Sequence, residues 1–313
     1  ANSLTHTVRV RAVIHFISFL INTYISPAYR DDSPKALSLL ASRLHTRLQL
    51  CRENYRTLTS NKFSQHSHSS QGFQSLSGAM VLSLYGIITP SSAQKHNPLN
   101  PFPSGHLQFR NFLIIRLLLN YGLRTGELLL LECSSIKPNL KGDKFSLIVT
   151  TVDEAYEPRK NAPSLKNAWA NRVLELDKQD YIFLSIYIAK LRPKTDKHDF
   201  IFTSSQQSAK PLSYTSVHSI FSKIDQVFTN QYPEYKSPLY SDSLQRLTPH
   251  TTRHTWAFLT LQKIWHLKYL KSQQNKTHFI AEVPSLSGIM EEAKDELRLM
   301  GGWSPTSQMP DLY

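Results

Sequence analysis

The chain has 313 residues, and its 36 Lys and Arg against 23 Asp and Glu give a formal net charge of +13. This excess favours a polyanionic partner, most simply nucleic acid. The two cysteines, Cys51 and Cys133, are far apart, which argues against a disulfide framework or a cysteine zinc site and fits a reducing compartment. No apolar run approaches the roughly 18 residues that span a bilayer, so no membrane association is expected.

The first part of the sequence predicts a small helical, basic domain. Residues 8–25 carry apolar side chains at helical spacing, and Ser33-Pro34 is a good start for a second helix. A short helix is expected around 79–85. Residues 88–105 hold four prolines and read as a linker, so we place the domain boundary near residue 98. The expected domains are residues 1–97, which are helical and basic and include the linker, and residues 98–313. The chain opens on Ala rather than Met, which is typical of a fragment.

The second domain is predicted to be mostly helical with a small antiparallel sheet, so the fold class is mainly α (α+β). An apolar helix should end at Gly122, a natural stop, and another should begin near Thr125. β-rich patterns predict strands, and amphipathic patterns predict helices. The expected strands are 145–152, 171–176 and 199–204, and the expected further helices are 178–191, 213–229, 249–270 and 286–300.

The stretch "RLTPHTTRHTWA" predicts an anion site at a helix start. Thr248 suits the N-cap and Pro249 suits the first helical position. His250 and Arg253 then share one face of the first turn, where free N–H groups and the helix dipole also favour an anion. The alternative is a solvated basic helix start, which is common in proteins.

Two further stretches carry candidate functional residues. In "NYGLRTGELLLL", Arg124 follows a helix end and offers a rigid fork for a carboxylate or phosphate; the alternative is a salt bridge to Glu127. In "LMGGWSPTSQMPDLY", a helix ends at a Gly pair, Trp303 follows, and Tyr313 stands ten residues later. No P-loop, no HExxH and no carboxylate cluster with two-metal spacing occurs, so a metal nuclease ranks last.

Taken together, these stretches resemble the tyrosine recombinases, the phage integrase family. The family pattern reads here, in order, as "GLRTGE", "SLKNAWANRVLEL", "HTTRH", "GGW" and "DLY". The resemblance implies two arginines that grip the scissile phosphate, a histidine, a hairpin lysine, a tryptophan where many members have histidine, and a nucleophilic tyrosine. Lys160 competes with Lys166 for the lysine role. The implied catalytic set is Arg124, Lys166, His250, Arg253, Trp303 and Tyr313.

The resemblance also implies a function and partners. We expect a site-specific recombinase, an integrase of a mobile element, that cleaves and rejoins double-stranded DNA through a 3′-phosphotyrosyl intermediate without metal, ATP or another cofactor. We expect a homotetramer on paired sites, in the cytoplasm with the nucleoid. Family members usually continue past the nucleophile with a helix that docks on a neighbouring protomer. The alternatives are a type IB topoisomerase-like enzyme and a sequence-specific DNA-binding protein that has lost catalysis.

Overall fold

A computed structural model of the chain describes residues 74–91, 97–103, 105–152, 157–205, 209–237, 243–275 and 285–313, with scattered positions between 12 and 49. The chain divides into two compact units, residues 1–72 and 73–313. The helices expected at 8–25 and from Ser33 lie outside the described residues apart from those scattered positions, which are helical. Residues 74–97, which the sequence analysis grouped with the first domain, belong to the second unit.

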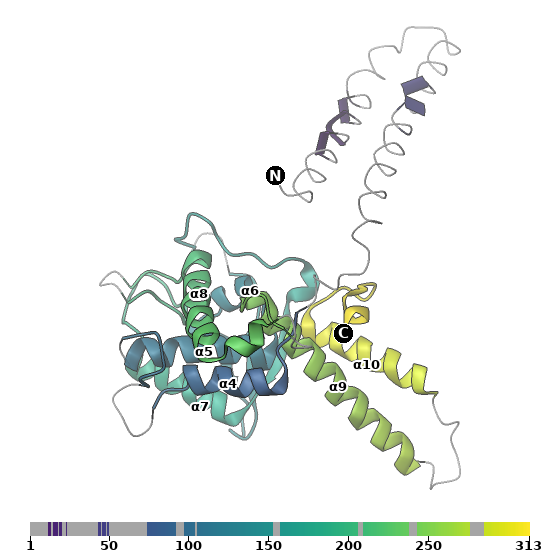
Figure 1. Ribbon diagram of the computed structural model, residues 1–313. Helices are drawn as coiled ribbons and strands as arrows, with labels where there is room; N and C mark the ends of the chain where they lie inside the picture. The colour runs from purple at the N-terminus through teal and green to yellow at the C-terminus, as the bar shows by residue number, and fades with distance from the viewer. Residues whose placement is uncertain are drawn as a thin grey trace. The chain divides into compact units, whose positions relative to one another are not determined.

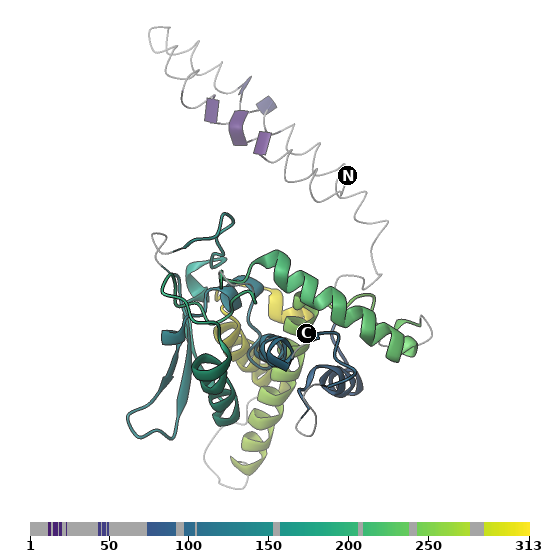
Figure 2. The same cartoon turned by 90° about the vertical axis from the view of Figure 1, so that its left-hand side faces the viewer.

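The second unit is mainly helical and carries one small antiparallel sheet, which confirms the predicted fold class (Figures 1 and 2). Its helices are α4 (Gly78–Ile88), α5 (Gly105–Tyr121), α6 (Thr125–Leu129), α7 (Lys178–Ile186), α8 (Tyr214–Gln231), α9 (Pro249–Asn275) and α10 (Leu286–Gly301). Its strands are β1 (Ile136–Pro138), β2 (Phe145–Val149) and β3 (Arg172–Leu176). Short 3₁₀ turns lie at Cys133–Ser135, Ala168–Ala170, Pro233–Lys236 and Met309–Leu312, and a π turn at Tyr187–Leu191.

Helix α5 forms the centre of the core, because apolar side chains occupy almost every face of it. It packs against α4 and α9, and Ile114, Ile115 and Leu118 are fully buried. Residues 97–103 of the proline-rich segment before it are packed against the helices. The buried side chain of Asn97 donates to three carbonyls at the end of α4, and buried Gln108 on α5 bonds the backbone of Asn97 and Phe102. These bonds satisfy backbone groups that would otherwise be buried without partners.

The sheet has the strand order β1-β2-β3, and both pairings are antiparallel. Alternate residues of β2 are buried, as expected for a strand with one face on the core. The prediction of a strand at 199–204 was wrong. Within the described part of this segment only two isolated bridges form, Glu132 with Phe200 and Thr203 with Pro211. Its apolar residues instead enter the core, since Phe200, Ile201 and Phe202 are each at most 2% exposed.

Helices α9 and α10 lie side by side and extend away from the other helices (Figure 1). Helix α9 begins at Pro249, as predicted, and the hydroxyl of Thr248 accepts a 3.1 Å hydrogen bond from the backbone N–H of Thr251. Such a cap contributes about 1 kcal/mol. The seam between the two helices buries Trp256, Ala293, Leu297 and Trp303. No helix among the described residues is long and apolar enough to cross a bilayer.

Candidate active site

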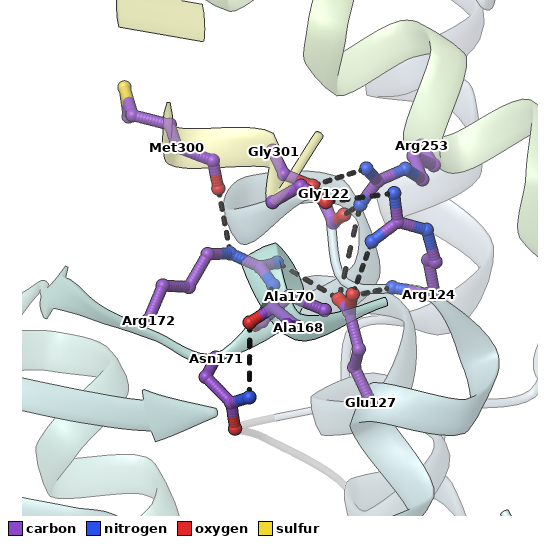
Figure 3. A network of polar contacts seen from close by, with 11 residues as sticks. Gly122, Arg124, Glu127, Ala168, Ala170, Asn171, Arg172, Arg253, Met300 and Gly301 are labelled. Atoms are coloured by element: carbon purple, nitrogen blue, oxygen red, sulfur yellow. Dashed lines mark hydrogen bonds and ion pairs between the residues drawn. The ribbon is translucent and has the colours of Figure 1, made fainter. Parts of the chain in front are cut away.

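A buried carboxylate gathers three arginines that are far apart in the sequence (Figure 3). Glu127, in α6, is 1% exposed. Its Oε1 lies 2.5 Å from Nη1 of Arg124, and its Oε2 lies 2.9 Å from Nη2 of Arg172 and 3.9 Å from Nη1 of Arg253. Its Oε2 also accepts the backbone N–H of Arg124 at 2.9 Å. The carboxylate therefore holds Arg124 and Arg172 by hydrogen bonds and has Arg253 within ion-pair distance.

The charges of this cluster do not cancel. Three guanidinium groups face one carboxylate, which leaves two positive charges in excess. Burial raises the pKa of Glu127, but the hydrogen bond and charge of Arg172, with Arg253 and Arg124, outweigh burial and hold that pKa below its ordinary value. The carboxylate is therefore ionised at neutral pH. The excess charge is suited to an anionic group such as a phosphodiester.

Arg253 is the most deeply placed arginine of the cluster. Its Nη1 donates to the carbonyl of Gly122, its Nη2 donates to that of Gly301 at 2.6 Å, and its guanidinium carbon lies 4.6 Å from the ring centre of Trp303. Burial, then the charge of Arg124, lowers the pKa of Arg253 to about 9, so it keeps its charge at pH 7. Since a guanidinium has five N–H donors, others remain for a ligand.

Two glycine turns bring these carbonyls to Arg253. Gly122 ends α5 with φ +58°, and a Cβ built on it would lie 2.1 Å from the ring of Trp256. Gly302 caps α10 in the left-handed region with φ +60°, and its carbonyl accepts from Nη2 of Arg124 at 3.3 Å. A side chain at Gly122 would both strain the backbone and displace the tryptophan. The stop predicted at Gly122 is thus part of the site.

One cavity of about 530 Å³, called the arginine cavity below, is lined by four of the six predicted site residues: Arg124, Lys166, His250 and Arg253. The cavity lies where the first turns of α6 and α9 meet α8 and the long hairpin loop between β2 and β3. Burial, then the charges of Arg253, Lys166 and Arg124, lowers the pKa of His250. The imidazole is therefore neutral at pH 7 and has a nitrogen lone pair available to accept a proton.

The loop that carries both candidate lysines is anchored by Arg159. Arg159 pairs with Glu157 at 2.6 Å and donates to the carbonyls of Leu129 and Leu212. Lys166, later in the same loop, lines the cavity beside His250, whereas Lys160 lines a second cavity of about 1180 Å³.

The second cavity, called the basic cleft below, is strongly basic. Its walls include the side chains of Arg110, Arg159, Lys160, Lys197, Lys210 and Lys223. No Asp or Glu occurs among the described residues that line it. Tyr214, at the start of α8, lines both cavities, so the second cavity is a neighbour of the arginine cavity.

Trp303 and Tyr313 lie behind the arginine cavity. Trp303 is buried between Arg253 and Trp256. The hydroxyl of Tyr313 lies 2.9 Å from Nδ1 of His254, and its ring centre lies 6.2 Å from that of Trp303. Neither aromatic residue is among the described residues that line the cavity. Burial raises the pKa of Tyr313, and the charges of Arg253 and Arg124 offset this only in part.

Two residues near the site were not singled out as site residues from the sequence. Arg172 and His254 both lie outside the predicted catalytic set. In the structure Arg172 bonds Glu127, and His254 contacts Tyr313. An Arg at the first position of a strand gives no sign of its partner. For His254, the available sequence signal was its position directly after Arg253 in "HTTRH".

Comparison with known families matches residues 94–275, more than half of the chain, to the phage integrase family. The matched segment contains Arg124, Lys166, His250 and Arg253, and it ends before Trp303 and Tyr313. No curated protein matches the sequence.

One solved recombinase shares the fold, and others are similar at lower TM-scores. An integrase of the Tn1549 transposon, in complex with circular intermediate DNA, is 13% identical, with 100% of this chain and 90% of that chain covered at a TM-score of 0.50. The XerH site-specific recombinase bound to difH is 16% identical, with a TM-score of 0.42. The match covers 72% of this chain but only 50% of XerH. XerA recombinase is 14% identical, with 96% and 76% covered and a TM-score of 0.40.

Proposed function

The chain belongs to the phage integrase family, and from that premise we propose that it is a site-specific recombinase that cleaves and rejoins DNA through a 3′-phosphotyrosyl intermediate, without metal or ATP. The observation that carries this proposal is the single cavity shared by Arg124, Lys166, His250 and Arg253, which come from three separate segments of the chain.

The arginines stabilise the charge of the reacting phosphate. A phosphodiester spreads one negative charge over two non-bridging oxygens, and attack on phosphorus adds charge to them. Glu127 already holds Arg124, and the carbonyls of Gly122 and Gly301 hold Arg253, so the two arginines need no reorganisation when that charge develops. Losing one such donor from a pre-organised site typically raises the barrier by about 3 kcal/mol.

Tyr313 is the nucleophile of this proposal. Its phenol oxygen attacks phosphorus, the bond to the 5′-oxygen breaks, and a 3′-phosphotyrosyl ester forms. The phenol proton passes to a base, for which neutral His250 is suited, and the departing 5′-oxygen takes a proton from Lys166. The ester conserves the energy of the phosphodiester. A 5′-hydroxyl of another strand can then attack it and release the tyrosine.

The basic cleft beside the cavity suits the DNA backbone. Its lysines can contact phosphates that flank the scissile one, because the two cavities are neighbours that share Tyr214. Contacts of this kind make the affinity fall steeply with salt. Recombination exchanges two strands at each of two sites, so four tyrosines are needed and a homotetramer on paired sites follows. Such an enzyme acts at the nucleoid.

The test is to find which DNA becomes covalently attached to the protein. The purified chain is incubated in EDTA with fragmented DNA of the candidate mobile element, and protein-linked DNA is captured after denaturation and sequenced. We expect one enriched site. A nicked suicide duplex of that site should then trap the complex, and Tyr313→Phe should abolish it. Trapping that persists in Tyr313→Phe refutes the nucleophile. Relaxation of plasmids without any preferred site would instead identify a topoisomerase-like enzyme, and specific binding without cleavage an inactive DNA-binding protein.

A further inference from the structure

The hydroxyl of Tyr313 meets an imidazole that the proposed mechanism does not use. Nδ1 of His254 lies 2.9 Å from that hydroxyl, within hydrogen-bond distance, and the ring centres are 5.6 Å apart. The two residues are 59 positions apart in the sequence; His254 is in α9, and Tyr313 directly follows the 3₁₀ turn Met309–Leu312. His254 is 5% exposed, so surrounding side chains fix its ring.

The surroundings of His254 determine which partner donates. His250 packs against it edge to face, with ring centres 4.1 Å apart, and Arg253 is the charged neighbour. Burial, then the proximity of His250 and Arg253, lowers the pKa of His254 to about 4. The ring is therefore neutral at pH 7. A neutral imidazole accepts at one nitrogen and donates from the other, and we assign the tautomer with the ring proton on Nε2, in which the Tyr313 hydroxyl donates to Nδ1.

This contact does not remove the phenol proton in the DNA-free state. The pKa of Tyr313 is raised and that of His254 is lowered, so transfer of the proton between them is unfavourable. The hydrogen bond instead fixes the position of the phenol. It holds the phenol next to Trp303, whose ring stacks on Arg253. A phenol with few accessible positions before DNA binds loses less freedom when it moves to the phosphate in the arginine cavity.

We propose that His254 is a positioning residue for the nucleophile, whose Nδ1 accepts the Tyr313 hydrogen bond and keeps the phenol beside the arginine cluster. This rests on the proposed function, because it gives the contact a role in the attack on DNA. The reaction described under the proposed function does not use the second histidine of "HTTRH". The present proposal gives this histidine a role in positioning.

The contact is tested first without DNA. Histidine ring resonances of the whole chain are followed by NMR through a pH titration, in the wild type and in Tyr313→Phe. A phenol that donates to Nδ1 favours the neutral imidazole, so its removal should raise the pKa of His254. The exposed His266 is the internal control and should titrate identically in both proteins. An unchanged His254 titration overturns the proposal, whatever the protein does to DNA.

The role is tested by covalent trapping on the suicide duplex with two variants. His254→Leu removes the acceptor and keeps similar bulk, and we expect trapping to slow by about 10–100-fold. His254→Asn retains an acceptor oxygen near the Nδ1 position and should recover most of the rate. The wild-type rate should also fall as the pH approaches about 4, because protonation of His254 removes its acceptor. His250 titrates in both proteins, so the ratio of wild-type to His254→Asn rates isolates His254.

The outcomes separate this proposal from the proposed function. Wild-type rates in His254→Leu, or no recovery in a folded His254→Asn, overturn the positioning role. If His254→Leu does not fold, the trapping rate of His254→Asn is measured as a function of pH. A rate that falls towards pH 4 in the same way as that of the wild type contradicts the role of His254. A positive NMR result with no covalent complex on any DNA would leave the contact in place and refute the recombinase.

Discussion

Arg172 and Glu127 are 45 residues apart in the sequence and form a 2.9 Å ion pair. Arg172 also donates from Nε to the carbonyl of Met300 and from Nη1 to that of Ala170, each at 2.8 Å. One side chain thus ties the sheet to α6 and to the end of α10 (Figure 3). The carboxylate that it supports is the one that holds Arg124 and Arg253, so the cluster is set before DNA arrives.

Replacing the shared carboxylate should destabilise the fold. Glu127→Gln removes the negative charge and leaves three buried or half-buried guanidinium groups facing one another. We expect a loss of about 3 kcal/mol in the free energy of unfolding at pH 7, measured by urea denaturation. Glu175→Gln, on the exposed face of β3, is the control and should change stability by less than about 0.5 kcal/mol. Equal stability of the two variants would contradict the importance of the cluster.

The same carboxylate predicts a pH dependence of stability. The pKa of Glu127 is depressed in the folded protein, so its contribution is present above the unfolded pKa of about 4.5 and is lost as the pH falls through the folded value. Glu127→Gln cannot lose this contribution. The difference in unfolding free energy between wild type and Glu127→Gln should therefore shrink below about pH 4.5. A difference that stays constant from pH 7 to pH 3 would contradict the assignment.

Two glycines with positive φ allow a matched test of the turn at the end of α5. Gly122→Ala puts a Cβ in a left-handed residue and 2.1 Å from the ring of Trp256, whereas Gly142→Ala has a similar φ and no atom within 4 Å. We expect Gly142→Ala to cost about 1 kcal/mol and Gly122→Ala about 2–4 kcal/mol, because overpacking adds to the backbone strain. Thermal and urea unfolding measure both. Equal costs would mean that the tryptophan moves aside freely.

Local chemistry made the start and stop signals of the site predictable from the sequence. The cap at Thr248 and the stop at Gly122 act through neighbouring backbone, and the motif order placed Arg124, His250 and Arg253. Contacts between distant segments were not accessible in this way. The partner of Arg172, the contact of His254 with Tyr313, and the packing of residues 97–103 through buried Asn97 depend on tertiary geometry. The apolar run at 199–204 has the composition of a strand. Its apolar side chains are buried in the core, but its backbone forms isolated bridges and no continuous β-ladder.

The two hairpin lysines should separate into different roles. Lys166 lies beside His250 in the arginine cavity, and Lys160 lies in the basic cleft. Lys166→Ala should slow covalent trapping by about 10²–10⁴-fold, because the 5′-oxygen then leaves without a proton. A substrate with sulfur in place of that bridging oxygen needs no proton, so it should restore most of the rate. Lys160→Ala should instead weaken DNA binding and reduce the salt slope of log K by about 1, with the cleavage rate of bound DNA unchanged. If sulfur rescues Lys160→Ala and not Lys166→Ala, the two assignments are reversed.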